Sequence, residues 1–239
     1  MATERFDGKV EVRDSSGANV RIALNGDTGN ITAGRGDADG DLVLQDGDGR
    51  ARIRLDAGGG NIWVGGNDAD GDIVIFPKDA TNRENVAEAT IHLDGDAGDI
   101  KLMGADCAEY FAVSEASRVD PGTVLVAGQD KSLGECTDAY DKRVVGVVSG
   151  AGELQPGIVL NKKVNKESSA PVALVGTVFC KVDARYGAVE VGDLLTTSAT
   201  PGHAMKAIEP DRAFGAVLGK ALGPLDTGRE LIPVLVTLR

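Results

Sequence analysis

Aspartates that recur beside glycines are the residues of this chain best suited to metal chemistry. Gly36-Asp-Ala-Asp-Gly-Asp41 and Asn67-Asp-Ala-Asp-Gly-Asp72 superficially match calcium-binding loops. An EF-hand loop requires glycine at its sixth position and a bidentate acid at its twelfth. Counted from Asp37, those positions hold Leu42 and Asp48. Because glycine permits positive φ and aspartate caps its own turn, we interpret the clusters as tight turns and predict no metal site.

Nucleophilic and phosphate-binding motifs are also missing. Nothing in the sequence marks Cys180 and His203 as neighbours, and a nucleophile and its base are recognised by geometry. Gly215-Ala-Val-Leu-Gly-Lys220 is one residue short of a phosphate-binding loop, and alanine follows where the magnesium-binding hydroxyl is needed. The three widely spaced cysteines predict buried free thiols. We therefore expect neither a cofactor nor an ordinary enzyme.

The chain of 239 residues has a formal net charge of −12, most of it in the first half. Residues 1–104 contain 20 acidic and 11 basic side chains, a net charge of −9. Nucleic acids and anionic membrane surfaces both attract clustered lysine and arginine, so we predict neither as a partner. We also expect synthesis in the cytoplasm without a signal peptide and no membrane insertion, because no apolar run approaches about 18 residues.

The elements that carry the Asp/Gly turns form a threefold repeat. The related segments are residues 21–34, 52–65 and 90–104, in which Ile22, Ile53 and Ile91 are equivalent. Apolar residues alternate with polar ones in nine short stretches, as expected for strands with one buried face. We predict that residues between the apolar pairs, such as Arg54 and His92, face outward, and that His92 is solvated without a partner.

Three strands and three corners per repeat are consistent with two triangular architectures. One is a coil of a β-helix within a single chain, and the other is a β-prism shared by three chains. Because a lone triangle with two apolar residues per face has a thin core and open edges, we favour a homotrimer. Intertwined β-stalks fold slowly, which gives a terminal domain that sets the register a physical purpose.

After residue 104 the pattern changes to continuous apolar runs bounded by glycine and proline. Such runs are typical of strands buried on both faces, for example Arg143-Val-Val-Gly-Val-Val-Ser149. The predicted fold class is therefore all-β. We expect a triangular β-helix or β-prism stalk over residues 1–104, followed by a compact β-barrel or sandwich domain over residues 105–239.

Several stretches of the second domain resemble a known family. Asp106-Cys-Ala-Glu-Tyr-Phe111, Pro121-Gly-Thr-Val and Tyr140-Asp-Lys-Arg-Val-Val-Gly-Val-Val-Ser149 look like the C-terminal domain of phage tail appendages and related bacterial fibre proteins. They are similar to the self-cleaving chaperone domain of the peptidase G2 type, which follows trimeric β-helical stalks. Residues 171–206 resemble a tail-fibre-associated module often found with that domain.

The resemblance implies a self-cleavage site at the domain junction. In the family the chain is cut just before the motif's aspartate with help from its glutamate, which implies Asp106 and Glu109 as catalytic residues and a scissile bond after Ala105. Self-cleavage needs a strained peptide with a carboxyl group within reach. The sequence departs from the family at Ala105, where serine is expected, and at Cys107, where tyrosine is usual. We expect Asp106 and Glu109 to cap turns instead.

The sequence therefore predicts a structural homotrimer, a fibre or spike component of a phage or phage-derived particle, in the virion or outside the cell. The C-terminal domain would serve as a trimerisation or tip module, and the partners would be other particle or tail components. One alternative is an intramolecular autoprotease-chaperone that cleaves after Ala105. Another is a tip that binds a cell-surface glycan or receptor through aromatic side chains, the candidates being Trp63, Tyr110, Tyr140 and Tyr186.

Overall fold

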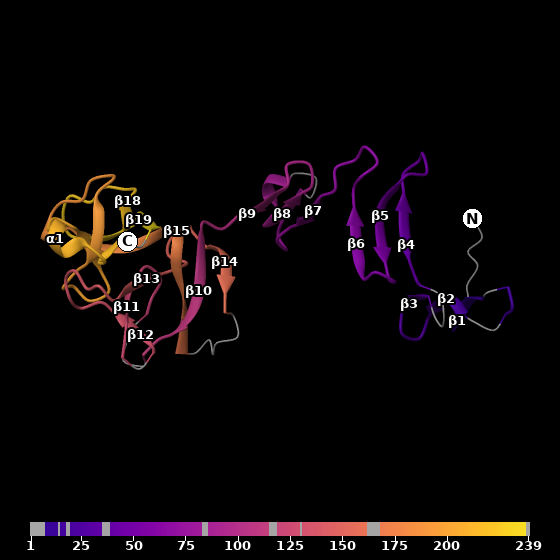
Figure 1. Ribbon diagram of the computed structural model, residues 1–239, viewed down its shortest axis with the longest axis horizontal. Helices are drawn as coiled ribbons and strands as arrows, with labels where there is room; N and C mark the ends of the chain where they lie inside the picture. The colour runs from indigo at the N-terminus through magenta and orange to yellow at the C-terminus, as the bar shows by residue number, and fades with distance from the viewer. Residues whose placement is uncertain are drawn as a thin grey trace. The chain divides into compact units, whose positions relative to one another are not determined.

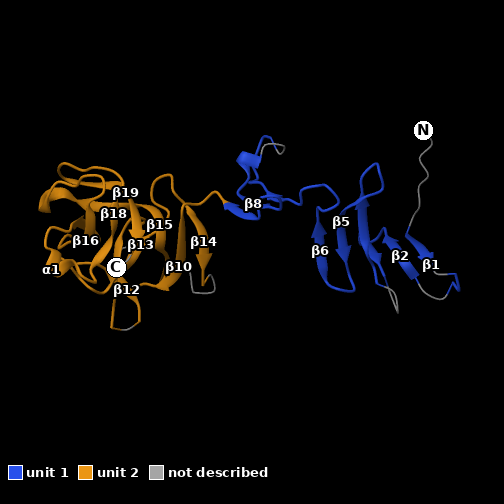
Figure 2. Cartoon of the chain, turned by 45° about the horizontal axis from the view of Figure 1, so that its top comes forward, with its two compact units in different colours: residues 1–101 blue, residues 102–239 orange. Residues whose placement is uncertain are grey.

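The computed structural model describes residues 8–13, 15–17, 20–34, 39–82, 86–114, 119–129, 131–161 and 168–237. The chain divides into two compact units, residues 1–101 and residues 102–239 (Figure 2). Strands dominate both units, so the predicted all-β class is confirmed. In the described residues the helices are limited to single turns, and none of them is long and apolar enough to cross a membrane.

The first unit contains three antiparallel sheets, each built from three consecutive strands (Figure 1). The elements are β1 (Lys9–Arg13), β2 (Val20–Asn25), β3 (Asn30–Ala33), β4 (Leu42–Gln45), β5 (Ala51–Asp56), β6 (Asn61–Val64), β7 (Ile73–Ile75), the 3-10 turn η1 (Val86–Glu88), β8 (Ile91–Asp94) and β9 (Asp99–Leu102). All nine predicted strands are present, and each sheet corresponds to one repeat. The alternation of apolar and polar residues therefore identified the strands correctly.

The Asn/Asp/Gly clusters between the strands of each repeat form turns, as predicted, whereas residues 35–38, which include part of the cluster at 36–41, lie outside the described residues. Asn25 Oδ1 accepts hydrogen bonds from the backbone amides of Asp27 and Thr28, at 3.0 and 3.3 Å. Asp56 Oδ1 accepts from the Gly59 amide in the second repeat, and Asp94 Oδ1 accepts from Ala97 in the third. Side chains that satisfy their own turn in this way fix the hairpin locally.

The three strands of a repeat pair with one another, which excludes the single-chain β-helix for the described residues. In a coil the strands of one repeat would form three different sides. Here Leu44 lies opposite Ile53, and Ile53 lies opposite Val64, so the three strands form one sheet. The tight turns cause this difference, because they reverse the chain and place each strand beside the one before it.

His92 corrects a second expectation. It faces away from the apolar residues of β8, but its side chain is buried, and its Nε2 lies 3.1 Å from Asp72 Oδ2. Asp72 lies directly before β7, the strand that pairs with β8, so the sheet brings the two side chains together. A lone histidine in the sequence gave no indication of this long-range partner.

The second unit is a large mixed sheet that closes on itself. Its elements are β10 (Asp106–Ala112), β11 (Val124–Ala127), β12 (Leu133–Glu135), β13 (Val144–Val148), β14 (Pro156–Leu160), β15 (Ser169–Asp183), the 3-10 turn η3 (Ala184–Tyr186), β16 (Leu194–Thr197), β17 (Ala204–Lys206), α1 (Pro210–Ala213), β18 (Val217–Ala221) and β19 (Arg229–Thr237). Strands β15, β17, β16, β18 and β19 follow in that order, and β19 pairs again with β15. The unit therefore contains a closed β-barrel, the first of the two predicted forms.

Buried aliphatic side chains fill the barrel. Val178 and Val182 of β15 pack in one cluster with Leu195, Leu218 and Val234 from the other barrel strands. Continuous apolar runs produced this arrangement because barrel strands point side chains inward while neighbouring elements cover part of the outside. All three cysteines are free; Cys136 and Cys180 are buried, as predicted, whereas Cys107 is only partly buried.

Candidate functional site

The junction motif begins β10, the central strand of a three-stranded ladder. β10 runs parallel to β14 and antiparallel to the long strand β15 (Figure 1). The Ala105 amide donates a hydrogen bond to the Gln155 carbonyl oxygen at 2.9 Å, and the Ala105 carbonyl oxygen accepts one from the Thr177 amide at 3.1 Å. The Ala105 peptide is therefore held on both sides by backbone hydrogen bonds.

Gly176 allows β15 to approach this peptide closely. Its φ is +114°, a left-handed value that strongly favours glycine. A Cβ atom at this position would lie 2.6 Å from the Ala105 carbonyl oxygen and 2.7 Å from Asp106 Cα. Any larger residue would therefore push β15 away from the junction and remove the Thr177 hydrogen bond.

Asp106 is buried, and only one of its two carboxylate oxygens has a hydrogen-bond partner among the described residues. Its Oδ1 accepts a hydrogen bond from Ser149 Oγ at 2.9 Å, and its Oδ2 has no hydrogen-bond partner in the described part of the chain. Burial raises the pKa of the Asp106 carboxyl above its ordinary value, and the Ser149 hydrogen bond opposes part of that rise. The residue borders an apolar cavity of about 220 Å³, together with Leu102 and Val175. It does not cap a turn.

Glu109 lies on the other face of the same strand. Asp106 and Ala108 are buried, whereas Cys107 and Glu109 are more exposed, which follows the two-residue alternation of a strand. Glu109 Oε1 is 3.5 Å from Asn161 Nδ2. Within one chain the structure therefore does not bring the two carboxylates of the motif together.

The first unit presents a different kind of candidate surface, the apolar face of each sheet. Of its described residues only Ala23 and His92 are buried, so the apolar residues predicted to face inward are not covered by their own chain. In the second sheet Ile53 is 37% exposed and Ile62 is 69% exposed. The face lacks cover because one sheet layer has nothing of its own to pack against. The large apolar residues exposed on these faces are Val10, Val12, Ile22, Leu24, Ile31, Leu42, Leu44, Ile53, Leu55, Ile62, Ile73, Ile75, Leu93 and Ile100.

The aromatic residues predicted as sugar platforms have unequal environments. Trp63 and Tyr186 expose 58% and 40% of their surface. Tyr140 is buried, and its hydroxyl oxygen accepts hydrogen bonds from the backbone amides of Ile208 and Glu209, at 2.9 Å each. The Arg212 guanidinium covers its ring, 4.4 Å from the ring centroid. Tyr140 therefore positions a loop and offers no open stacking face.

Sequence reasoning missed the residues that surround the junction. Ser149, Gly176 and Thr177 contact Ala105 or Asp106 across 43 to 72 positions of sequence. Gly176 and Thr177 follow an apolar run, and such a pair is too common in strands to indicate a functional site. The described residues hold no cluster of three or more histidine, cysteine or acidic side chains suited to a metal ion.

Comparison with known proteins gives limited matches. The chain matches no family model and no curated protein. Its structural neighbours include the pre-mature form of bacteriophage phi29 gene product 12, with a TM-score of 0.41, 14% identity, and coverage of 62% of this chain and 24% of that chain. The C-terminal fragment of the same gene product matches with a TM-score of 0.37 and 14% identity, covering 55% of this chain and 100% of that fragment. The chain thus spans about a quarter of the first neighbour.

Proposed function

We propose that this chain is a structural subunit of a homotrimeric fibre or spike, carried by a phage or phage-derived particle in the virion. Residues 1–104 form the shaft as a three-chain β-prism, and residues 105–239 form a trimerisation or tip module. Other particle or tail components are its partners. The observation that carries the proposal is the exposed apolar face on each of the three N-terminal sheets.

These faces are too regular to be incidental. In the second sheet Leu42 lies opposite Leu55, and Leu44 lies opposite Ile53, so the apolar side chains form two continuous rows across the strands. Exposed apolar patches of this kind mark interaction surfaces. Covering the remaining exposed part of each isoleucine or leucine contributes about 1 kcal/mol. The fourteen exposed apolar side chains of each chain, twelve of them isoleucine or leucine and two valine, supply enough to hold an assembly together.

An assembly of three copies would cover the apolar faces of all its chains. If each sheet forms one side of a triangular prism, every apolar face points to a common threefold axis and every polar face points to solvent. The predicted triangle is then made by three chains, with one sheet from each, and the same arrangement repeats at each of the three sheets. The hairpin turns lie at the ends of the strands, where they do not obstruct the contacts between faces.

The mass in solution tests this proposal. Light scattering or native mass spectrometry of the full chain should give about 74 kDa, three times the 24.6 kDa of one chain. The mass should persist on dilution and in high salt, because apolar contacts are not screened by ions. A mass of one or two chains would contradict the trimer.

A second function, intramolecular self-cleavage, is favoured by one local observation. Asp106, which directly follows the Ala105 peptide, is buried, has a raised pKa, and has one carboxylate oxygen without a hydrogen-bond partner among the described residues. Glu109 would have to act from another copy or after a rearrangement, since it lies on the opposite face of β10. This proposal makes the chain an autoprotease-chaperone whose cut separates residues 1–105 from residues 106–239.

Intact mass measured over days at several pH values tests cleavage. Two fragments that meet between Ala105 and Asp106 are expected, and Glu109→Gln should abolish them. Glu153→Gln, which makes the same change at an exposed position of the same unit, should cleave normally. A single species of 24.6 kDa under all conditions would refute the self-cleavage proposal and leave the structural one intact.

A further inference from the structure

His92 and Asp72 form a contact in the third repeat whose strength depends on the charge of the histidine. His92 is 8% exposed, and its Nε2 lies 3.1 Å from Asp72 Oδ2. The two atoms lack hydrogen-bonding geometry, and His92 Nε2 has no hydrogen-bond partner among the described residues. The contact is therefore an ion pair when the imidazole is protonated, whereas a neutral imidazole leaves a buried nitrogen unsatisfied.

Asp72 also connects two segments of the third sheet. Its Oδ1 accepts a hydrogen bond from the Gly95 amide at 3.1 Å. Gly95 lies in the turn between β8 and β9, and a Cβ atom there would lie 2.5 Å from the Gly71 carbonyl oxygen. The residues before β7 and the turn after β8 are therefore in close contact, and Asp72 links them. A charged His92 holds the second oxygen of the same carboxylate.

The second repeat contains the same link with a permanent charge. Asp41 Oδ1 accepts a hydrogen bond from the Ala57 amide at 3.1 Å, and Asp41 Oδ2 lies 2.6 Å from Arg54 Nη2. Strand register places Arg54 and His92 at equivalent positions of their sheets. Arginine stays protonated throughout the ordinary pH range, whereas histidine ordinarily changes its charge between about pH 5 and 8.

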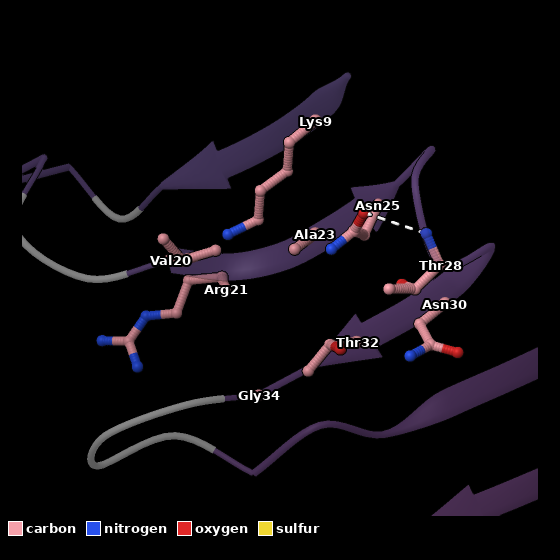
Figure 3. A pocket seen from close by; sticks show the side chains of 9 residues that line it. All are labelled: Lys9, Val20, Arg21, Ala23, Asn25, Thr28, Asn30, Thr32 and Gly34. Atoms are coloured by element: carbon pink, nitrogen blue, oxygen red, sulfur yellow. Dashed lines mark hydrogen bonds between the residues drawn. The ribbon is translucent and has the colours of Figure 1, made fainter.

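In the first repeat Ala23 occupies the equivalent position, with a cavity of about 160 Å³ beside it (Figure 3). There a backbone hydrogen bond joins the residue before β1 to the turn after β2, from the Gly26 amide to the Gly8 carbonyl oxygen at 2.9 Å. The alanine methyl group carries no charge. Of the three equivalent residues, His92 is therefore the one whose charge changes near neutral pH.

The charged groups around His92 favour its protonated form. Asp94 lies two residues further along β8 and pairs with Lys101 of β9, the strand that Asp99 begins. Because residues two apart in a strand share a face, three acids and one lysine accompany His92 on this side of the described sheet. The adjoining described segments carry Asp68, Asp70, Lys78, Asp79, Glu88 and Asp96. Carboxylates and lysine ordinarily keep their charge between about pH 5 and 8, so His92 is the group that titrates in this range.

We propose that His92 is a pH-sensitive switch in the third repeat. As the pH falls through the range in which histidine ordinarily takes up its proton, the imidazolium pairs with Asp72 and reinforces the link to Gly95. As the pH rises, the proton leaves to solvent, the ion pair is lost and the link weakens. The third sheet is therefore more stable in mild acid than at neutral pH, whereas the second sheet, linked through Arg54, does not change. The switch lies within one chain and does not depend on the trimer.

Hydrogen exchange of the full chain at about pH 5.5 and about pH 7.5 tests the switch, because histidine ordinarily changes its charge between these values. After correction for the intrinsic exchange rate, the amides of the turn over residues 94–99 should be about fivefold better protected at the lower pH, as expected for one ion pair. The equivalent turn over residues 56–61 should change by less than about twofold, because Asp41 pairs there with arginine. Equal protection of the third turn at both pH values would overturn the proposal.

Three substitutions distinguish a switch from a histidine with a purely structural role. His92→Arg copies the second repeat and should give strong protection at both pH values. His92→Gln is neutral and should give weak protection at both, so the pH dependence disappears even if arginine does not fit. His203→Gln makes the same change at the other histidine of the chain and should preserve the wild-type response. A response that survives His92→Gln, or that is lost in His203→Gln, would refute the assignment to His92.

Discussion

Replacing Ile53 by aspartate should leave the chain monomeric, with a mass of 24.6 kDa. Ile53 is the central apolar residue of the second sheet, opposite Leu44 on one side and Val64 on the other. In a threefold prism its three copies would meet near the axis. The substitution would put three carboxylates there, each without a partner and away from water, at a cost of several kcal/mol per chain.

The same substitution on the opposite face provides the control. Val43 lies in the adjacent strand of the same sheet and is 42% exposed in the single chain, close to the 37% of Ile53. Val43→Asp changes charge and β-propensity in the same way, but Val43 lies on the polar face, opposite Arg54. Its trimer should persist. If both variants or neither dissociate, the apolar face is not the interface, and light scattering distinguishes these outcomes directly.

Replacing Asp183 by asparagine should lower the free energy of unfolding of the barrel unit by about 2–3 kcal/mol. Asp183 is fully buried at the end of β15, and its Oδ1 accepts from the Arg185 amide at 3.0 Å. Its Oδ2 accepts from Thr200 Oγ1 at 2.6 Å and also pairs with the Arg185 guanidinium. Asparagine removes the negative charge and replaces one carboxylate oxygen by an NH2 group. That group would face the N–H and O–H donors of Arg185 and Thr200.

The effect of Asp183→Asn should depend on pH in a defined direction. Hydrogen bonds from Arg185 and Thr200 hold the pKa of Asp183 well below its usual range, against the opposing effect of burial. A carboxyl whose pKa is lower in the folded state stabilises the fold above its unfolded pKa of about 3.9. That contribution is lost as the pH falls below this value. The difference between wild type and variant should therefore be constant from neutral pH to about pH 5 and shrink in stronger acid.

Urea or thermal unfolding of both proteins between pH 2 and pH 7 measures this difference. Glu209→Gln is the matched control, since Glu209 pairs with Arg212 in the same unit but both side chains are half exposed. It should change stability by less than about 0.5 kcal/mol at any pH, as exposed ion pairs do. A variant gap at Asp183 that stays constant down to pH 2 would show that its charge contributes nothing to the fold.

Strands and turns could be predicted from the sequence, whereas the contacts between distant residues could not. The two-residue alternation of Ile22 with Leu24, and of their equivalents, identifies strands because successive side chains of a strand point to opposite faces. The aspartates beside glycine identify turns because they bond to amides two to four positions away. The change from alternating to continuous apolar runs near residue 105 is likewise visible, and the predicted domain boundary rests on it.

The sequence did not indicate which strands pair with one another. The alternation around Ile53 is the same whether its neighbours belong to one chain or to three, so it could not separate a β-helix coil from the observed three-stranded sheets. His92 gave no sign of Asp72, twenty positions earlier, and Ala105 gave no sign of Thr177. Each of these depends on which strands lie side by side.

The motif at the junction shows the same division. The sequence by itself determined that Asp106 and Glu109 lie three residues apart, directly after the last repeat. The tertiary structure decided that they occupy opposite faces of β10, that Asp106 is buried against Ser149, and that Thr177 donates to the preceding carbonyl. The physical reason is that turn and strand preferences act over a few residues, whereas burial and ladder contacts join positions far apart in the chain.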